Sequence, residues 1–378
     1  MRRDLPGLLV AVFLLASCGS SGGSSAGDAV LDAASADGDS ALDVAPPKPT
    51  WAAVPGATMD AVKQLKGFAC GAGSLHVSLV GNMTEGLFSK PVADESEFAQ
   101  VFTGVGLLAM TDAGVLLAQY GGQNETSSLT LVTADGAPTD TGYAFEQTEI
   151  RALQVVGSFV LALAKDWTVA EYMVHRGSLA AGTFEQLGKR LNETAMSMYA
   201  TTDTVYLLTQ MNEYSGTRCY HAAITSGDTD EWVPCEGFPE YVKYKEGQAF
   251  SIKAVLYGSG SSVALWFRVN DKGEEKYRHY VTTGDGVWTE IAGFPQKQPS
   301  AWYHDGTWLY LGFEGAGSEE SLYRAAADGS VAPEPFGLGF GEAVDKSGPV
   351  ALCGMDQALY AVWLDYQLSG SVVTIYGL

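Results

Sequence analysis

Short apolar runs separated by turn residues fill the chain from residue 51 to residue 378. The runs are rich in β-branched and aromatic residues, and clusters of Gly, Asp, Asn and Ser separate them. Almost no stretch shows the 3.6-residue period of an amphipathic helix. This pattern predicts that residues 51–378 form an all-β domain.

One unit of this pattern, a polar turn followed by an apolar strand, recurs seven times. Successive copies lie 40 to 58 residues apart when they are marked by Leu75, Val115, Phe159, Tyr206, Ala264, Leu309 and Leu359. A four-stranded propeller blade repeats about every 40 to 50 residues, and residues 299–337 contain four short strands joined by polar turns. We therefore predict a seven-bladed β-propeller. The alternatives are a β-sandwich pair and a six-bladed ring with extra strands.

The two ends of this region complement each other. The seventh copy ends at Leu378 after three strands, whereas WAAVPG at 51–56 resembles the end of a copy, such as WTEIAGFP at 288–295. We predict that 51–56 forms the outer strand of the last blade. Hydrogen bonds between the two ends of the domain would then close the ring and leave no unpaired edge there.

Four cysteines lie in the predicted domain, and they allow three pairings. Cys219 and Cys235 are symmetric about Gly227, so they can face each other across a hairpin. Cys70 and Cys353 each end a first strand, in the first and seventh copies, which are neighbours across the predicted seam. We predict both disulfides. The second closes a very long loop and should contribute on the order of 4 to 5 kcal/mol in the chain-entropy model.

The first seventeen residues have a different pattern. Arg2 and Arg3 precede an apolar run at 8–15 that is too short to span a bilayer as a helix. The segment LASC, which ends at Cys18, resembles the lipobox of bacterial lipoproteins. The resemblance implies a signal peptide at 1–17, a lipidated Cys18 as mature N-terminus and an anchor in the membrane; an ordinary secretory signal with an incidental cysteine is the alternative. Gly19 is not the Asp that marks inner-membrane retention in such proteins, so the resemblance implies the outer membrane, on its periplasmic or surface side.

Residues 18–50 contain Gly, Ser, Ala, Asp and Pro but no aromatic residue, with five Asp against one Lys. We expect a disordered acidic tether between Cys18 and the domain. The region 51–378 has 19 basic and 38 acidic residues. This excess excludes nucleic acid as a partner and favours cationic ones. We expect a monomer.

Two turns before tryptophans resemble the Asp box of sialidase-like propellers, Ser/Thr-x-Asp-x-Gly-x-Thr-Trp. They are TTGDGVWTEI at 282–291 and TSGDTDEW at 225–232. The resemblance implies a structural turn on the face away from any active site, with Asp285 and Asp228 in the turns and Trp288 and Trp232 packed between blades.

The polar residues do not assemble a recognisable catalytic motif. A sialidase-like enzyme needs three arginines that converge on a substrate carboxylate, and only Arg151 and Arg190 of the seven in 51–378 lie near the start of a first strand. The five histidines are scattered singly and are interpreted as hydrogen-bonded strand or turn residues. We assign no catalytic residue. A propeller-type glycosidase or lyase that acts on extracellular glycans is kept as the alternative.

The loops between second and third strands each carry a carboxylate, and aromatic residues are interleaved with them. We call this set, with two tyrosines of the loop that enters the fifth copy, the acidic face: Glu85, Tyr120, Asp166, Trp167, Glu213, Tyr214, Tyr241, Tyr244, Asp271, Asp365 and Tyr366. It would suit a sugar, a cationic peptide, an envelope protein or calcium, and no other cofactor is implied. The alternative is that these are the ordinary polar loops of an acidic protein. We predict a lipid-anchored, non-catalytic binding or scaffold module.

Overall fold

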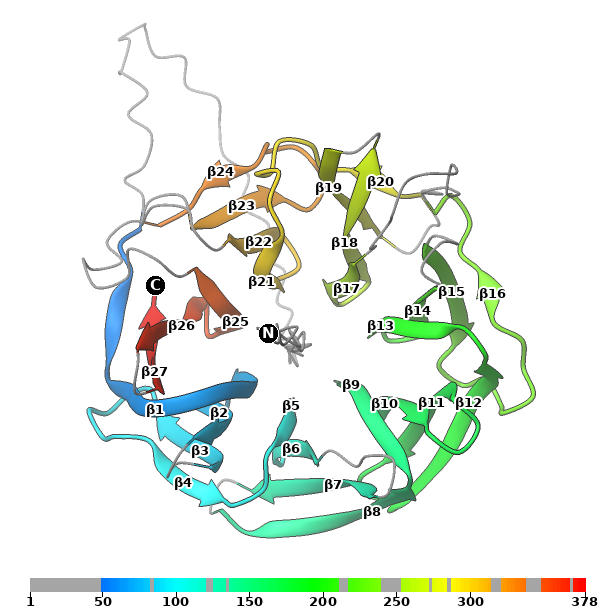
Figure 1. Ribbon diagram of the computed structural model, residues 1–378, viewed down its shortest axis with the longest axis horizontal. Helices are drawn as coiled ribbons and strands as arrows, with labels where there is room; N and C mark the ends of the chain where they lie inside the picture. Colours follow the sequence, from blue (N-terminus) through cyan, green and yellow to red (C-terminus); the bar gives the residue numbers. More distant parts are fainter. Residues whose placement is uncertain are drawn as a thin grey trace, which may run out of the picture.

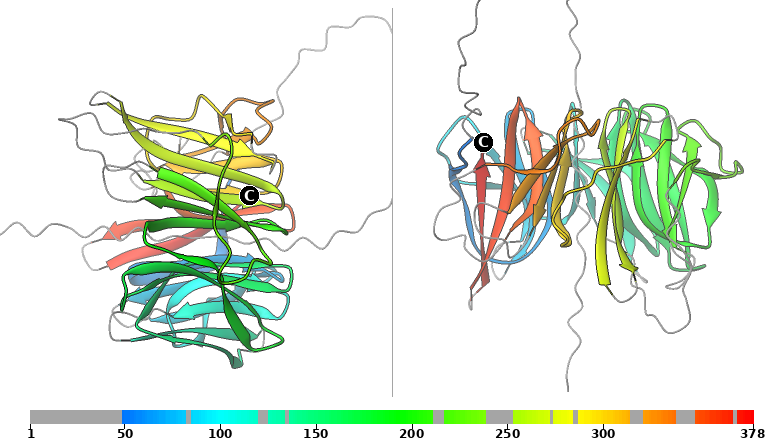
Figure 2. Two further views of the ribbon diagram at one scale, coloured as in Figure 1. Left: turned by 90° about the vertical axis from the view of Figure 1, so that its right-hand side faces the viewer. Right: turned by 90° about the horizontal axis from the view of Figure 1, so that it is seen from above.

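The computed structural model describes residues 49–81, 85–119, 125–133, 136–210, 217–238, 253–271, 274–283, 287–313, 321–337, 348–367 and 370–378. Within these ranges the chain is all β, as the sequence predicts. Antiparallel sheets lie side by side around a common axis (Figure 1), and their strands run across the thickness of the ring (Figure 2). This is the architecture of a β-propeller. The described part of the chain has no helix long and apolar enough to cross a membrane.

Five sheets contain four strands each, ordered from the axis outward in chain order (Figure 1). The first is β5 (Gly106–Thr111), β6 (Gly114–Gln119), β7 (Thr126–Thr133) and β8 (Pro138–Glu146). The second is β9 (Thr148–Val156), β10 (Phe159–Asp166), β11 (Glu171–Ser178) and β12 (Thr183–Leu191). The third is β13 (Thr194–Ala200), β14 (Thr204–Gln210), β15 (Thr217–Ala223) and β16 (Val233–Pro234). The fourth is β17 (Ala254–Ser259), β18 (Ser262–Asp271), β19 (Glu274–Thr282) and β20 (Thr289–Glu290), and the fifth is β21 (Pro299–His304), β22 (Trp308–Phe313), β23 (Leu322–Ala326) and β24 (Glu334–Pro335).

The remaining sheet has seven strands because the long strand β1 (Ala52–Gly71) belongs to two four-stranded units. On one side of β1 lie β25 (Pro349–Met355), β26 (Ala358–Gln367) and β27 (Gly370–Gly377); on the other lie β2 (Ser74–Gly81), β3 (Gly86–Pro91) and β4 (Ala99–Phe102). The first part of β1 pairs with β27, beginning with Ala52 opposite Gly377, and the second part pairs with β2. In Figure 1, β1 starts at the rim and ends near the axis.

This pairing places Ala52 and Ala53 beside the last strand, as predicted for residues 51–56, and it continues beyond the predicted segment to Val62. The sequence did not show that the outer strand of one unit and the inner strand of the next are one continuous strand. The innermost strands also contact one another in order: β1 touches β5, the contacts continue through β9, β13, β17, β21 and β25, and β25 touches β1.

Apolar side chains fill the spaces between neighbouring sheets. In one such cluster, Leu116 and Leu129 of the first four-stranded sheet pack with Leu153 and Val160 of the second. The second strand of each unit is buried on both faces, since a sheet lies on either side of it, and this explains its continuous apolar run. The outer strand β8 alternates exposed with buried residues instead. All seven markers of the repeat lie in these second strands.

Trp51 fixes the start of β1. Its side chain is buried between Phe336, beyond β24, and Trp363 of β26. Gly337 allows this close packing, because a Cβ at that position would lie 2.0 Å from the indole Nε1 of Trp51. The first residue of WAAVPG therefore fills the junction between the last two units of the propeller.

The two turns that resemble an Asp box differ in how deeply their tryptophans are buried. Trp232 is buried in the cluster between β9–β12 and β13–β16, and its indole N–H donates to the carbonyl of Lys189 at 2.8 Å. Trp288 is half-buried against Phe238. Asp228 is exposed, and the turn carboxylate that accepts the Gly227 N–H is that of Asp230. Asp285 lies outside the described residues.

Both predicted cysteine pairs lie at bonding distance. The Cα atoms of Cys70 and Cys353 are 6.0 Å apart, and those of Cys219 and Cys235 are 5.3 Å apart. Cys70 and Cys353 are buried in the cluster that joins the units on either side of β1. Cys219 and Cys235 link β15 to the residue after β16, so the symmetry about Gly227 identified a real hairpin.

We expect the two disulfides to stabilise the fold unequally. Cys70 and Cys353 are separated by 283 residues, whereas Cys219 and Cys235 are separated by 16. In the chain-entropy model, loss of the first lowers the free energy of unfolding by about 5 kcal/mol and loss of the second by about 3 kcal/mol. Urea unfolding of the two double Cys→Ala variants measures this difference. A larger loss for the hairpin pair would contradict it.

Candidate functional site

Neighbouring strands are antiparallel, so successive connections alternate between the two faces of the propeller. The loops from second to third strands therefore lie on the same face as the loops from outer strands to the next inner strand. The acidic face is therefore one surface of the propeller. The structure does not describe all of it. Tyr120, Glu213, Tyr214, Tyr241 and Tyr244 lie outside the described residues, as do the side chains of Asp271 and Tyr366 at the ends of β18 and β26.

The four described members of the acidic face differ in environment. Glu85 and Asp365 are exposed. Asp166 is buried with 9% of its surface accessible, and Trp167 is half-buried, with the ammonium of Lys165 3.5 Å from its ring centroid. The backbone N–H of Trp167 donates to the carbonyl of Gln147 at 2.9 Å, so the loop after β10 is tied to the turn between β8 and β9.

Asp166 is the best-connected carboxylate of this face. Its Oδ1 accepts the N–H of Thr168 at 2.8 Å and the Thr168 hydroxyl at 2.5 Å, and its Oδ2 accepts from Arg190 Nη1 at 2.8 Å. Burial by itself raises the pKa of Asp166, but the bonds from Thr168 and Arg190 more than offset this and hold the pKa below its usual value. Asp166 is therefore ionised and orients Arg190.

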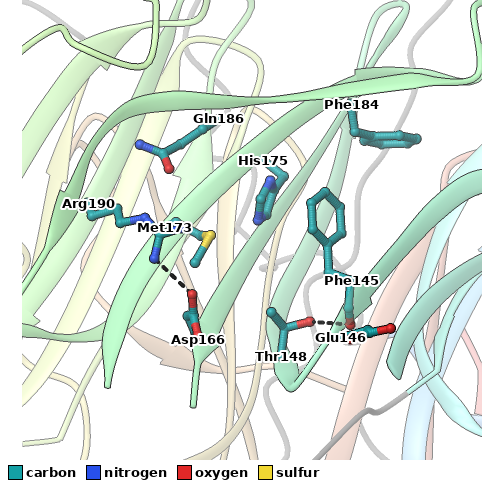
Figure 3. A pocket seen from close by; sticks show the side chains of 9 residues that line it. All are labelled: Phe145, Glu146, Thr148, Asp166, Met173, His175, Phe184, Gln186 and Arg190. Carbon is teal, nitrogen blue, oxygen red and sulfur yellow. Dashed lines mark hydrogen bonds and ion pairs between the residues drawn. The ribbon is translucent and has the colours of Figure 1, made fainter. Parts of the chain in front are cut away.

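Asp166 and Arg190 line a pocket of about 270 Å³ between the first and second four-stranded sheets (Figure 3). We call this the intersheet pocket. Its other lining residues come from the end of β8, the start of β9, β11 and β12: Phe145, Glu146, Thr148, Met173, His175, Phe184 and Gln186. The pocket joins the acidic face to the groove between two blades.

His175 forms a buried polar part of this wall, with 4% of its surface accessible. Neither ring nitrogen has a hydrogen-bond partner. The ring of Phe145 packs against it at 4.2 Å between centroids, and Tyr143 meets it edge-on at 5.5 Å. Burial, with a smaller contribution from Arg190, lowers the pKa of His175 to about 4, although Asp166 acts in the opposite direction. His175 is therefore neutral at physiological pH.

The interpretation of the histidines as hydrogen-bonded residues is correct for His304 and wrong for His175 and His279. His304 Nε2 bonds to the Ser262 hydroxyl, and its Nδ1 accepts the N–H of Gly306. His279 is buried like His175 and has two unpartnered ring nitrogens, with Phe294 4.6 Å away. His279 does not line the intersheet pocket.

Every arginine in residues 51–378 lies beside a carboxylate. The pairs are Arg151–Glu149, Arg176–Glu185, Arg190–Asp166, Arg218–Glu193, Arg268–Glu275, Arg278–Glu290 and Arg324–Glu334. Several of these pairs join adjacent strands, as Arg176 and Glu185 do directly across β11 and β12. The guanidinium groups are thus engaged with the protein's own carboxylates.

Within the described ranges, no three His, Cys, Asp or Glu side chains are arranged to hold a metal ion. Calcium as a ligand of the acidic face stays a prediction, because most of the loops that suggested it lie outside those ranges.

No protein-family model matches the chain, and no curated protein matches it. Solved structures are similar in fold. An oligogalacturonate lyase from Vibrio parahaemolyticus has a TM-score of 0.54 at 9% identity, over 81% of this chain and 86% of that one. An acylaminoacyl peptidase from Pyrococcus horikoshii has a TM-score of 0.53 at 9% identity, over 82% and 50%. A prolyl endopeptidase has a TM-score of 0.53 at 13% identity, over 84% and 47%. The chain spans about half the length of the two peptidases, and at these identities the likeness shows the fold alone.

Most of the intersheet pocket was not predicted. Asp166 was found because every second-to-third loop carries a carboxylate, but Phe145, Phe184 and His175 lie in strands with no unusual pattern. A signal was present in β11, where His175 directly follows the apolar residues Tyr172 to Val174 and continues their buried run.

Acid is expected to destabilise the protein through His175. Its pKa is about 4 in the folded protein and 6.5 ordinarily, so its contribution to stability is complete above pH 6.5 and is lost as the pH falls towards 4. Between about pH 7 and about pH 4.5, a His175→Phe variant should lose about 2 kcal/mol less of its free energy of unfolding than the wild type. Urea unfolding at the two pH values tests this, and identical losses would contradict it.

Proposed function

We propose that this protein is a lipid-anchored lipoprotein of the cell envelope whose seven-bladed propeller binds a ligand or partner without catalysis. Cys18 would carry the lipid after removal of 1–17, and residues 18–50 would tether the domain, favouring the outer membrane. The pairing of β1 with both β27 and β2, and the ordered contacts of the innermost strands, support a count of seven blades and closure by β1.

Two features support export. The leader has the order of a secretory signal and ends in LASC. The domain pairs all four of its cysteines at bonding distance, and disulfides persist in oxidising compartments such as the periplasm but are rare in the cytosol.

The observation that carries a binding role is the intersheet pocket beside the acidic face. Its wall holds a buried histidine whose two nitrogens have no partner in the protein, which is costly unless a ligand or water satisfies them. Asp166 has a lowered pKa, and both of its oxygens are bonded to neighbours, so its role is to orient Arg190 and the loop after β10. A glycosidase acid needs a raised pKa instead.

Substitution of Cys18 by Ala is expected to release the protein from the membrane. The wild type should incorporate labelled palmitate and partition into detergent, because about 0.8 kcal/mol is gained for each buried CH₂ of a lipid chain. Cys18→Ala should do neither.

Cys219→Ala with Cys235→Ala is the matched control, since it removes cysteines from the domain and leaves Cys18 intact. This control should still be labelled. Labelling of Cys18→Ala, or a wild type confined to the cytosol, would contradict the anchor.

A further inference from the structure

The intersheet pocket is large enough for one ring. Its volume of about 270 Å³ is slightly below the range for sites that hold drug-sized molecules, which is about 300 to 1,000 Å³. It is walled by two different sheets, with Phe145 and Glu146 of β8 from one and Thr148, His175, Gln186 and Arg190 from the other (Figure 3). A ligand here would be one unit of a chain or a small molecule.

The charges of the pocket select against ions. Arg190 is paired with Asp166 at 2.8 Å and lies 3.9 Å from Glu171, and Glu146 adds a further negative charge at the rim. Among the lining residues, an anion would meet two carboxylates, those of Asp166 and Glu146, against one guanidinium. A cation would have to sit beside Arg190, while Asp166 is already engaged with it. An uncharged ligand avoids both the repulsion of an anion by the carboxylates and the repulsion of a cation by Arg190.

The polar groups of the pocket match a ligand that both donates and accepts hydrogen bonds. The neutral imidazole of His175 has one donor and one acceptor nitrogen, and both are unpartnered. Gln186 donates through Nε2 to the carbonyl of Gly188 at 2.8 Å, so its Oε1 is the acceptor that it can offer a ligand. Each hydroxyl is at once a donor and an acceptor, so hydroxyls match this mixed set better than amines or carboxylates.

The remaining wall is apolar. Phe145, Phe184 and Met173 line the pocket, and the ring of Phe145 is held against His175. The C–H face of a pyranose ring is apolar, while its hydroxyls project around the rim, so one sugar unit meets both kinds of wall.

We propose that the intersheet pocket binds an uncharged pyranose unit of a glycan, with His175 and Arg190 bonded to its hydroxyls and Phe145 and Phe184 packed against its ring. This inference rests on the proposed binding function and names the ligand class of that site.

The test uses the full lipidated chain in detergent and saturation-transfer NMR, with glucose, galactose, mannose and N-acetylglucosamine as probes. Galacturonate and glucuronate are the charged counterparts, and an oligolysine peptide is the cationic one. At least one neutral sugar should bind saturably, and its uronate should bind at least about tenfold more weakly.

His175→Phe should weaken sugar binding at least about tenfold, since it keeps a ring and removes both polar atoms. His279→Phe is the matched control, because His279 is equally buried and unpartnered but lies outside the pocket. It should leave binding unchanged. If His175→Phe fails to fold, Arg190→Met provides the second variant, with the same expected loss.

Three outcomes overturn the inference. They are no saturation transfer to any neutral sugar, tighter binding of the uronates than of the neutral sugars, and sugar binding that persists in both His175→Phe and Arg190→Met. Binding of the cationic peptide alone, lost in His175→Phe, would overturn the sugar assignment and leave the binding function standing. Failure of Cys18 to be lipidated would remove the envelope anchor without touching this result.

Discussion

The backbone pairing of β1 with two neighbours is the interaction on which the rest of the molecule depends. One strand of twenty residues hydrogen-bonds to β27 with its first part and to β2 with its second. It thereby joins the first unit of the chain to the last. Trp51 packs at one end of this strand, and Cys70 is bonded to Cys353 near the other. Main-chain hydrogen bonds, an aromatic plug and a disulfide thus act on the same seam.

This seam has consequences for sheets that lie far from it. A propeller packs each sheet against the next, so each groove between sheets depends on how its neighbours are held. The intersheet pocket lies in one such groove, where the apolar cluster of β5–β12 gives way to polar residues near the strand ends. The side chains of that wall are fixed by neighbours from both sheets, as Phe145 of β8 packs on His175 of β11.

The fold was predictable because local sequence patterns, namely apolar runs and hairpin symmetry, determine it. The second strands are buried on both faces, so their apolar runs recur at the blade spacing. Cys219 and Cys235 are bonded across a hairpin, so they lie symmetrically about Gly227 in the sequence. The site was much less predictable. Asp166 follows from the loop pattern, but its bond to Arg190 spans 24 residues and depends on the order of β10, β11 and β12. The contact of Phe145 with His175 depends on two sheets lying side by side, and no local pattern encodes it.

The most direct test of the account is the stability of the chain after deletion of residues 51–56, compared with deletion of residues 19–45 in the tether. The first deletion removes Trp51 and the start of the β1–β27 pairing. It should lower the free energy of unfolding by at least about 3 kcal/mol, since loss of a buried tryptophan alone costs that much. The second should leave thermal and urea unfolding unchanged. An equally stable protein without residues 51–56 would show that β1 does not hold the ring together.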